Sequence, residues 1–443
     1  MSKGILQLAW AHGRAWGVGV LLAAAGPAGA EVYQWNGSNS TAWTDAANWQ
    51  PTAGSIFLGP APTGGTYNVR LNVNNGALNE LIYDAALGDT VYASTTNLGA
   101  PSRGLVVGSG SSGRLRLTGG SLSTLGSTAA DVVGNGAGHT GILHLDGGVF
   151  TGNDAGLALG LGGGPVSRLI ITSGVATVAG LTLFATTSSV DLDGGTLAAR
   201  QVTGFGGAMT FNFNGGLLQA RTNSGSFLGG LTRANVRNNG ARVDSAGFNV
   251  TIAQALEHSN VGGDAATDGG LVKSGLGALT LSGTNTYTGP TDIQAGALFV
   301  NGVLGAGAVT VAAGAGLGGS GVISGEVTTA GGLLLPGAGP GTVGTLSLAA
   351  GLTLSGGDTV QVEVASASSL DRIQVAGIVN PAGVTTFVLA GDVAALAPGN
   401  YQLLVAGTAL FGDDSNFELV APASRLASYD LLHDAFSVTQ AVY

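Results

Sequence analysis

Paired aspartates are the first residues whose spacing could do chemistry. Asp146 and Asp193 occupy the same position of a recurring motif, LHLDGGVF at 143–150 and VDLDGGTL at 190–197. If each copy is one coil of a stack, the two carboxylates lie two strand spacings apart, about 9.6 Å, near the upper limit for an inverting glycosidase. Thr172 fills the same position in the coil between them. A turn whose side chain bonds its own backbone two residues on explains the whole row and is our default interpretation.

A second acidic set could serve a polysaccharide lyase or hydrolase, which needs two or three acids beside a basic side chain. Asp191 and Asp193 with Arg168 or Arg200 come nearest to that arrangement. A carbohydrate-active β-helix is therefore the alternative function. Scattering of these groups over different faces of a rod would end that hypothesis.

Three tryptophans could bind sugar by stacking. Trp35, Trp43 and Trp49 lie close together among Asn and Asp residues, as a carbohydrate-binding module would require. The interpretation we favour is a cap over the open end of a solenoid. Terminal repeats of solenoids are atypical, and an uncovered strand edge promotes aggregation.

Other chemistry has no support in the sequence. Residues 108–113 spell G-x-G-x-x-G, but a predicted strand at 115–117 follows them, where a dinucleotide site needs a helix. The absence of Cys excludes thiol nucleophiles and thiolate metal sites. We predict no catalytic residue, no cofactor and no metal. The histidines beyond the first thirty residues are interpreted as exposed surface residues: His139, His144, His258 and His433.

Short strands between glycine turns must position these residues. Five stretches, starting at 115, 143, 169, 190 and 211, read apolar, variable, apolar, then Thr, Asp or Asn, then usually Gly. Their spacing of roughly 21 to 28 residues, without helical periodicity, is typical of a β-solenoid. Alternation along each strand predicts that Leu115, Leu117, Leu143, Leu145, Val190, Leu192, Phe211 and Phe213 point inward, and that Arg116, His144, Ile170, Asp191 and Asn212 point outward.

Composition agrees with a β-rich chain and narrows the partners. The 443 residues include 80 Gly, and only 9% are charged. Gly at this level disfavours long helices, and 44% hydrophobic residues exclude a disordered chain. The net charge is −10, with no cluster of Lys and Arg. We therefore expect neither nucleic acid nor an anionic lipid surface as a partner.

The first thirty residues predict export. Lys3 and Arg14 precede or flank an apolar stretch at 16–25, and Ala28-Gly29-Ala30 supplies a cleavage site before Glu31. Ten apolar residues are too few for a membrane core, which takes roughly 20. We expect an exported mature chain, 31–443, without a transmembrane segment.

A denser motif lies in the second half of the chain. GLVKSGLGALTLSGTNTYTGPTDIQAGALFVNG at 270–302 contains K-x-G-x-G-x-L-x-L-x-G, then N-x-Y-x-G-x-T, then G-x-L. The pattern resembles the autotransporter-associated β-strand repeat, or passenger-associated transport repeat, of bacterial surface proteins. The positions that carry the resemblance are Lys273, Gly275, Gly277, Leu279, Leu281, Gly283, Asn285, Tyr287, Gly289, Thr291, Gly296 and Leu298.

This resemblance implies a right-handed parallel β-helix at the cell surface or secreted, with motif residues that are structural. A complete autotransporter continues into a C-terminal membrane barrel. The residues after Gly407 are too few for one. We therefore do not expect self-transport through a barrel of its own, and the sequence leaves open whether the chain is a remnant of a longer passenger or works with a separate outer-membrane translocator.

We predict an all-β chain with an atypical N-terminal cap and a β-rich C-terminal closing region. Its expected function is that of an exported, non-enzymatic structural or adhesive protein of a Gram-negative-type bacterium. Surface glycans, matrix or further copies of the chain are its expected partners. The predicted organisation is a signal peptide at 1–30, a cap and irregular start at 31–100, a β-solenoid block at 101–257, a loop at 258–270, the autotransporter-associated block at 271–350 and a β region at 351–443.

Overall fold

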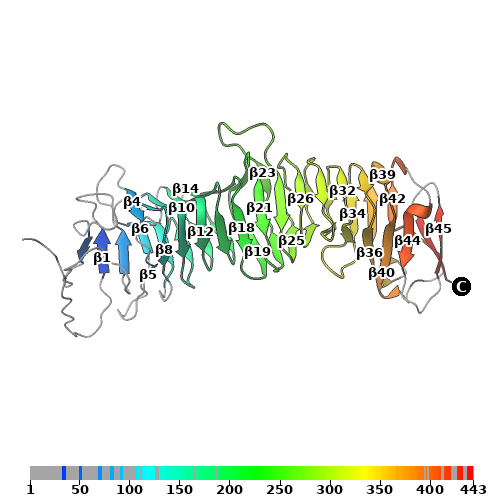
Figure 1. Cartoon of the computed structure of the whole chain (residues 1–443), viewed down its shortest axis with the longest axis horizontal. Helices are drawn as coiled ribbons and strands as arrows, with labels where there is room; N and C mark the ends of the chain where they lie inside the picture. The colour runs from blue at the N-terminus through cyan, green and yellow to red at the C-terminus, as the bar shows by residue number, and fades with distance from the viewer. Residues whose placement is uncertain are drawn as a thin grey trace, which may run out of the picture.

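The structure is a rod of coils stacked along one axis (Figure 1). This computed structural model describes residues 105–442, except 110–111, 125–128, 137, 163–165, 185–186, 367, 394–395, 397–398, 411–413, 421–426 and 433–436, and before residue 105 it describes five strands. The predicted all-β parallel solenoid is confirmed. The described residues include a short 3-10 turn, η4 (Asp414–Asn416), and contain no helix that could cross a membrane.

Three ladders of parallel strands run along the rod. The first ladder comprises β4 (Glu80–Tyr83), β7 (Gly113–Leu117), the first halves of β10 (Gly141–Thr151) and β12 (Ser167–Thr177), β14 (Thr187–Leu192), β17 (Ala208–Phe213), β20 (Arg233–Val236) and β23 (Leu256–His258), then β28 (Val303–Leu304), β31 (Val322–Ile323), β34 (Thr345–Leu348), β38 (Arg372–Val375) and β42 (Leu404–Ala406). The second comprises β5 (Thr90–Tyr92), β8 (Ser121–Ser123), the second halves of β10 and β12, β15 (Thr196–Ala199), β18 (Leu217–Ala220), β21 (Ala241–Asp244), β24 (Leu271–Ser274), β26 (Thr291–Ile293), β29 (Val309–Val311), β32 (Val327–Thr329), β35 (Leu352–Leu354), β39 (Ile378–Pro381) and β43 (Ala409–Leu410).

The third ladder is the longest. It comprises β3 (Asn68–Leu71), β6 (Leu105–Ser109), β9 (Asp131–Asn135), β11 (Leu157–Leu159), β13 (Leu181–Phe184), β16 (Val202–Phe205), β19 (Ser224–Gly229), β22 (Val250–Ile252), β25 (Ala278–Leu281), β27 (Ala297–Val300), β30 (Gly316–Gly319), β33 (Leu333–Pro336), β36 (Asp358–Ser366), β40 (Thr385–Gly391) and β44 (Phe417–Val420). The ladder therefore continues through both repeat types of the sequence.

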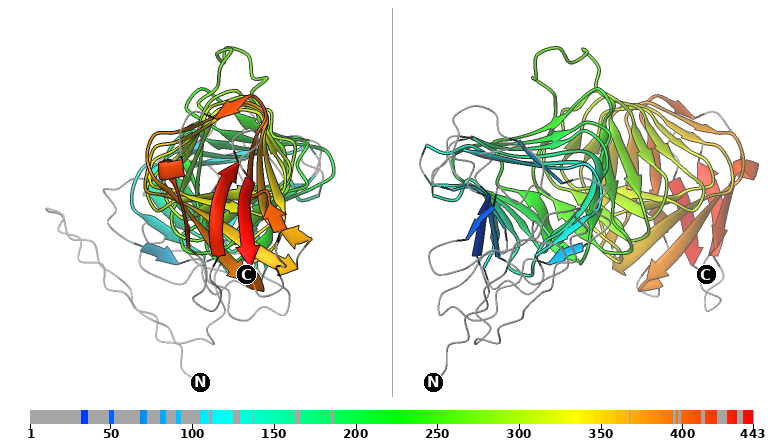
Figure 2. Two further views of the ribbon diagram at one scale, coloured as in Figure 1. Left: turned by 90° about the vertical axis from the view of Figure 1, so that its right-hand side faces the viewer. Right: turned by 60° about the vertical axis from the view of Figure 1, so that its left-hand side comes forward.

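Strand pairing changes at the two ends of the rod. Near the N-terminus, β1 (Val32–Trp35) pairs in parallel with β3 and antiparallel with β2 (Trp49–Pro51). Near the C-terminus, β41 (Gly399–Tyr401), β45 (Ala427–Leu432) and β46 (Ser437–Val442) form an antiparallel sheet. This sheet lies at the end of the stack of coils (Figure 2). A short antiparallel partner, β37 (Ser369–Leu370), folds back on β36.

The core is a column of stacked apolar side chains inside the coils. All eight residues predicted to point inward are completely buried: Leu115, Leu117, Leu143, Leu145, Val190, Leu192, Phe211 and Phe213. Asp131 is an acid at an inward position, paired in register with the core residue Leu157. Its carboxylate accepts hydrogen bonds from Leu105 N (2.8 Å) and Thr124 Oγ1 (2.5 Å). Burial raises the pKa of Asp131 to about 7 despite these hydrogen bonds.

Glycine is required where one coil passes close to the next. Gly174 lies at a bend in β12 with a φ of +83°, and a Cβ atom there would lie 2.2 Å from the carbonyl oxygen of Gly148 in the preceding coil. Any side chain would therefore force two backbones apart as well as strain φ.

We expect Gly174→Ala to lower the free energy of unfolding by more than about 2 kcal/mol, because it combines a backbone clash with a strained φ. Gly225→Ala is the matched control, since a Cβ at Gly225 meets no atom within 4 Å. Urea unfolding followed by circular dichroism measures both variants. Equal midpoints for the two would contradict the required close approach.

Candidate functional site: a charged face and a buried repeat motif

The tryptophan cluster is only partly described. Trp35 in β1 lies opposite Trp49 in β2 in the antiparallel register. Trp43 lies outside the described residues. The sugar-stacking platform and the cap both stay predictions.

The Asp146 row bonds across coils. Thr172 Oγ1 donates to Asp146 Oδ1 (2.9 Å), and Asn214 Nδ2 donates to Asp193 Oδ1 (2.9 Å). Arg116 pairs with Asp146 and, by its hydrogen bond, holds the pKa of that carboxyl below its usual range. The contacts of Asp146 and Asp193 therefore run between coils, and the predicted bond of each side chain to its own backbone two residues on stays a prediction. Neighbouring coils lie only about 4.8 Å apart, so a side chain in the next coil is within reach.

The second acidic set is divided between two places. Arg168 Nη2 and Nε donate to Asp191 Oδ2 at 2.6 and 3.1 Å. Asn212 Nδ2 occupies the other oxygen at 2.6 Å. Arg200 lies elsewhere and pairs with Asp154 at 3.2 Å. The structure thus brings Arg168 and Asp191 together, fills both carboxylate oxygens with donors and leaves Arg200 out.

A row of hydrogen-bonded amide side chains continues from Asp191 along the first ladder of strands. Asp191, Asn212 and Asn235 lie in register in consecutive coils, and Asn235 Nδ2 donates to Asn212 Oδ1 (2.8 Å). Arg233 covers the end of the row, with Nε donating to Asn235 Oδ1 (2.6 Å). These positions alternate with core residues, as predicted, yet Asp191, Asn212 and Asn235 are buried. Stacked amides that bond each other exclude solvent from the row.

Two of the histidines, His144 and His258, form side-chain hydrogen bonds. His144 is buried between Arg114 and Thr172, with ring nitrogens 3.3 and 3.2 Å from their side chains. The predicted exposure of His144 is therefore wrong. His258 Nδ1 lies 2.9 Å from Asp268 Oδ2. His433 lies outside the described residues, and these contain no group of three potential metal ligands.

Asp268 organises the base of the loop at 259–270, which rises from the rod near β23 (Figure 1). Its buried carboxylate accepts hydrogen bonds from the backbone N–H groups of Thr288 (2.8 Å), Gly289 (2.9 Å) and Gly270 (2.9 Å). Burial opposes ionisation, but these bonds and that of His258 lower the pKa of Asp268. The carboxylate thereby ties the loop to the following coil.

Arg237 holds the outer part of the same loop. Its Nε and Nη2 donate to the two oxygens of Asp264 at 2.8 and 2.9 Å, and Ser259 Oγ donates to the same carboxylate at 2.5 Å. The charged face, as we call it, comprises the side chains that meet over the first ladder of strands. Its members are Arg116, His144, Asp146, Arg168, Asp191, Asp193, Arg233, Arg237, Glu257 and Asp264.

The repeat motif of the second half is built around a buried ammonium group. Lys273 lies between Val243 and Ile293 in the register of the second ladder, and it is completely buried. Its Nζ donates to the carbonyl oxygens of Ser274 (2.9 Å), Gly275 (2.8 Å) and Ala295 (2.9 Å). Burial lowers the pKa of Lys273 to about 8, although the charge of Asp244 opposes that shift.

Asn285 and Tyr287 replace a strand of the first ladder between β23 and β28. Asn285 Oδ1 accepts from Leu256 N (3.0 Å), and its Nδ2 donates to Val303 O (3.0 Å). The side chain thus joins the coils on either side. Tyr287 is buried, its hydroxyl lies 2.6 Å from Thr291 Oγ1, and burial raises the pKa of its phenol.

The remaining motif positions fit the same coils. Leu279, Leu281 and Leu298 are completely buried. Gly296 leaves room for Lys273, because a Cβ atom there would lie 3.0 Å from Nζ and 2.3 Å from Gly277 O. The residues that first appeared as a sequence pattern therefore form one connected structural unit.

Comparison with known proteins identifies this unit. Residues 271–299 match the family described as Passenger-associated-transport-repeat. This segment is similar to a passenger-associated transport repeat. A second match is to the adhesin BmaC autotransporter of Brucella suis biovar 1 (strain 1330), 43% identical over 72 residues. That match covers 16% of this chain and 2% of the length of that protein. The matched segment, called the transport repeat below, begins in β24 and ends in β27, so it forms parts of two successive coils of a longer solenoid.

Sequence reasoning missed two polar arrangements, the bonds of Asp268 and the row formed by Asp191, Asn212 and Asn235. Asp268 has no motif of its own, because its partners are backbone groups of a coil about twenty residues away. The Asp191–Asn212–Asn235 row could have been found by aligning the strands, since all three follow an apolar residue at the same place in each copy.

We expect Lys273→Met to lower the free energy of unfolding by about 2 kcal/mol at pH 7, because a buried carbonyl without a donor costs about 1–3 kcal/mol. Ile293→Met, the adjacent inward position on the same ladder, is the control and should cost less than about 1.5 kcal/mol. The pKa of Lys273 is lower in the folded chain than in the unfolded chain. The free energy of unfolding of the wild type should therefore rise as the pH increases from about 8 to 10.5, the ordinary pKa of lysine. Chemical denaturation across this range should show the rise in the wild type and not in Lys273→Met. An identical pH profile would contradict the burial of the ammonium.

We expect Asp264→Asn to expose the loop at 259–270 to subtilisin about tenfold faster, because loss of one well-ordered ion pair shifts a local opening equilibrium by about 1.4 kcal/mol. Arg237 holds the pKa of Asp264 below its usual range, so the wild-type loop should also lose protection as the pH falls through that lowered pKa. The control is Asp154→Asn, whose Arg200 pair is exposed and should contribute little. Unchanged cleavage in Asp264→Asn would show that the loop is held by other contacts.

Proposed function

We propose that this chain is an exported, non-enzymatic passenger-like rod, displayed at the cell surface or secreted, with a structural or adhesive role. The observation that carries the proposal is the place of the transport repeat in the rod. Its strands β24 and β25 pair with β21 and β22 on one side and with β26 and β27 on the other. The repeat is thus an integral part of one continuous stack.

Several features support a display role. Backbone ladders and side-chain rows join each coil to the next, which favours a stiff rod. The partial similarity to an adhesin autotransporter supports adhesion, and the apolar stretch at 16–25 supports export. The proposed partners are surface glycans, matrix or further copies of the chain, with a separate outer-membrane translocator for transport.

Expression of the full chain in a Gram-negative host tests this proposal. We expect the protein in the medium, or on intact cells where added protease digests it, with an N-terminus at Glu31. Cells or surfaces carrying it should bind immobilised glycan or matrix more than vector controls do, without release of reducing sugar ends. A double variant, Leu21→Arg with Leu22→Arg, disrupts the apolar stretch and should keep the protein inside the cell. Protein that stays in the cytoplasm with residues 1–30 still attached would contradict export, and release of sugar ends would favour the carbohydrate-active alternative.

A further inference from the structure

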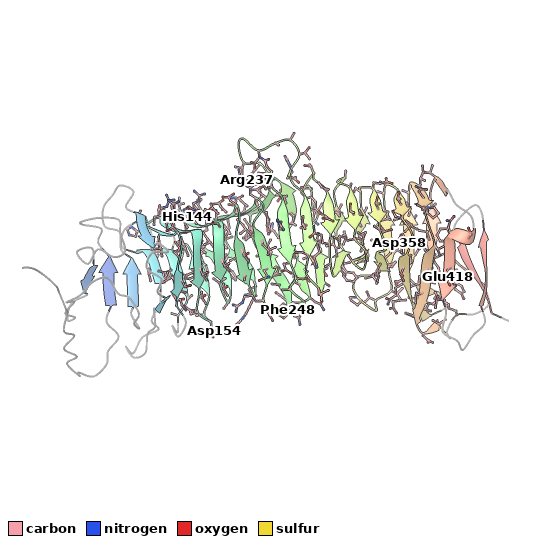
Figure 3. All side chains as sticks on the ribbon, in the orientation of Figure 1. His144, Asp154, Arg237, Phe248, Asp358 and Glu418 are labelled. Atoms are coloured by element: carbon pink, nitrogen blue, oxygen red, sulfur yellow. The ribbon has the colours of Figure 1, made fainter. Side chains whose placement is uncertain are left out.

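A polar groove of about 400 Å³ lies at the corner between the second and third ladders. The side chains that define it are those of Asp154, Thr182, Arg200, Gln201, Thr222 and Asn223. In Figure 3, Asp154 lies at the lower edge of the rod, whereas His144 and Arg237 of the charged face lie at the upper edge. The groove and the charged face are therefore separate surfaces.

The groove differs from the charged face in how its side chains are bonded. The hydroxyl groups of Thr182 and Thr222 and the amide of Gln201 have no hydrogen-bond partner among the described residues. Its two charged groups, Asp154 and Arg200, pair with each other. The groove therefore offers several free donors and acceptors with no net charge.

An aromatic surface adjoins the groove on the third ladder. Thr182 and Thr203 are paired in register, and two residues further along the same strands Phe184 and Phe205 are paired in register. Alternation along a strand places these four side chains on one face. The phenyl rings are stacked with centroids 5.8 Å apart and an interplanar angle of 18°, and Phe205 is 60% exposed.

We propose that the groove and the Phe184–Phe205 pair together bind a neutral oligosaccharide. Sugar rings carry hydroxyl groups at the rim, which match the free groups of the groove, and C–H faces, which pack on aromatic rings. The paired charges of Asp154 and Arg200 and the net charge of −10 disfavour a polyanionic ligand. The inference rests on the proposed adhesive role and gives it a ligand class and a location.

Titration of the purified full chain with neutral hexasaccharides, namely cellohexaose, maltohexaose, mannohexaose and chitohexaose, tests the proposal by isothermal calorimetry and ligand-observed NMR. We expect at least one to bind, and Phe205→Ala to weaken that binding about tenfold, as for truncation of an anchoring aromatic side chain. Gly180 also lines the groove, so Gly180→Leu should abolish binding by filling it. Gly180 tolerates a side chain, because a Cβ atom there approaches only Gln201, at 3.7 Å or more.

Leu276→Ala is the matched control, since Leu276 is exposed at 72% and lies outside the groove. It should bind as the wild type does, and circular dichroism should show that all variants are folded. The proposal is overturned if none of the four sugars binds or if only an acidic oligosaccharide such as alginate binds. It is equally overturned if Phe205→Ala and Gly180→Leu bind normally, or if Trp43→Ala alone abolishes binding.

The same variants separate this inference from the proposed function. If cells displaying Phe205→Ala adhere as well as the wild type, the groove is not the adhesive site and the surface role stands. If the purified chain binds sugar through the groove but is never exported, the groove stands and the surface role fails.

Discussion

Every coil of this rod must hydrogen-bond its backbone to the coil before and the coil after, and this constraint determines most of the structure. Strands at the same place in neighbouring coils pair in parallel and in register, so the corners between them must repeat as well. At a corner such as Gly174, the backbone passes so close to the preceding coil that a Cβ atom would collide with a carbonyl oxygen. The unusual glycine content of the chain follows from repeating such corners along the rod.

The same stacking explains where polar groups are buried. A polar side chain at one position of a coil lies one strand spacing from its counterpart, so neighbours can satisfy each other without solvent. Asp191, Asn212 and Asn235 do so on the outside of the rod. Where no counterpart exists, backbone groups take that role: Lys273 binds three carbonyl oxygens inside the rod, and Asp268 accepts three backbone N–H groups at the base of a loop. Within the transport repeat, the Asn285 side chain bonds the backbone of Leu256 and Val303 and so replaces missing strand pairing.

These relations decide how much could be predicted from the sequence. The inward residues, such as Leu115 and Phe211, were predictable because alternation along a strand is a local property. The bonding of Asp146 was not, since its partner Thr172 lies in the next coil and the distance between coils, rather than the turn, decides the contact. The burial of His144 and Asp191 was missed for the same reason. The sequence could not show that Arg168 pairs with Asp191 whereas Arg200 pairs with Asp154, because the pairing depends on where in the coil each arginine lies.

The two polar surfaces of the rod differ in what they leave available to a partner. On the charged face, Asp191 has both oxygens occupied, and Asp264 is held by Arg237 and Ser259. A ligand that binds there would first have to break existing hydrogen bonds and ion pairs. Its own bonds could at best replace them. In the corner groove, the side chains of Thr182, Thr222 and Gln201 have no hydrogen-bond partner in the part of the chain that the structure describes, and Phe205 keeps most of its surface exposed. A ligand there displaces water and breaks no side-chain bond within the described part of the rod, so binding is favoured where neighbouring coils leave their side chains without protein partners.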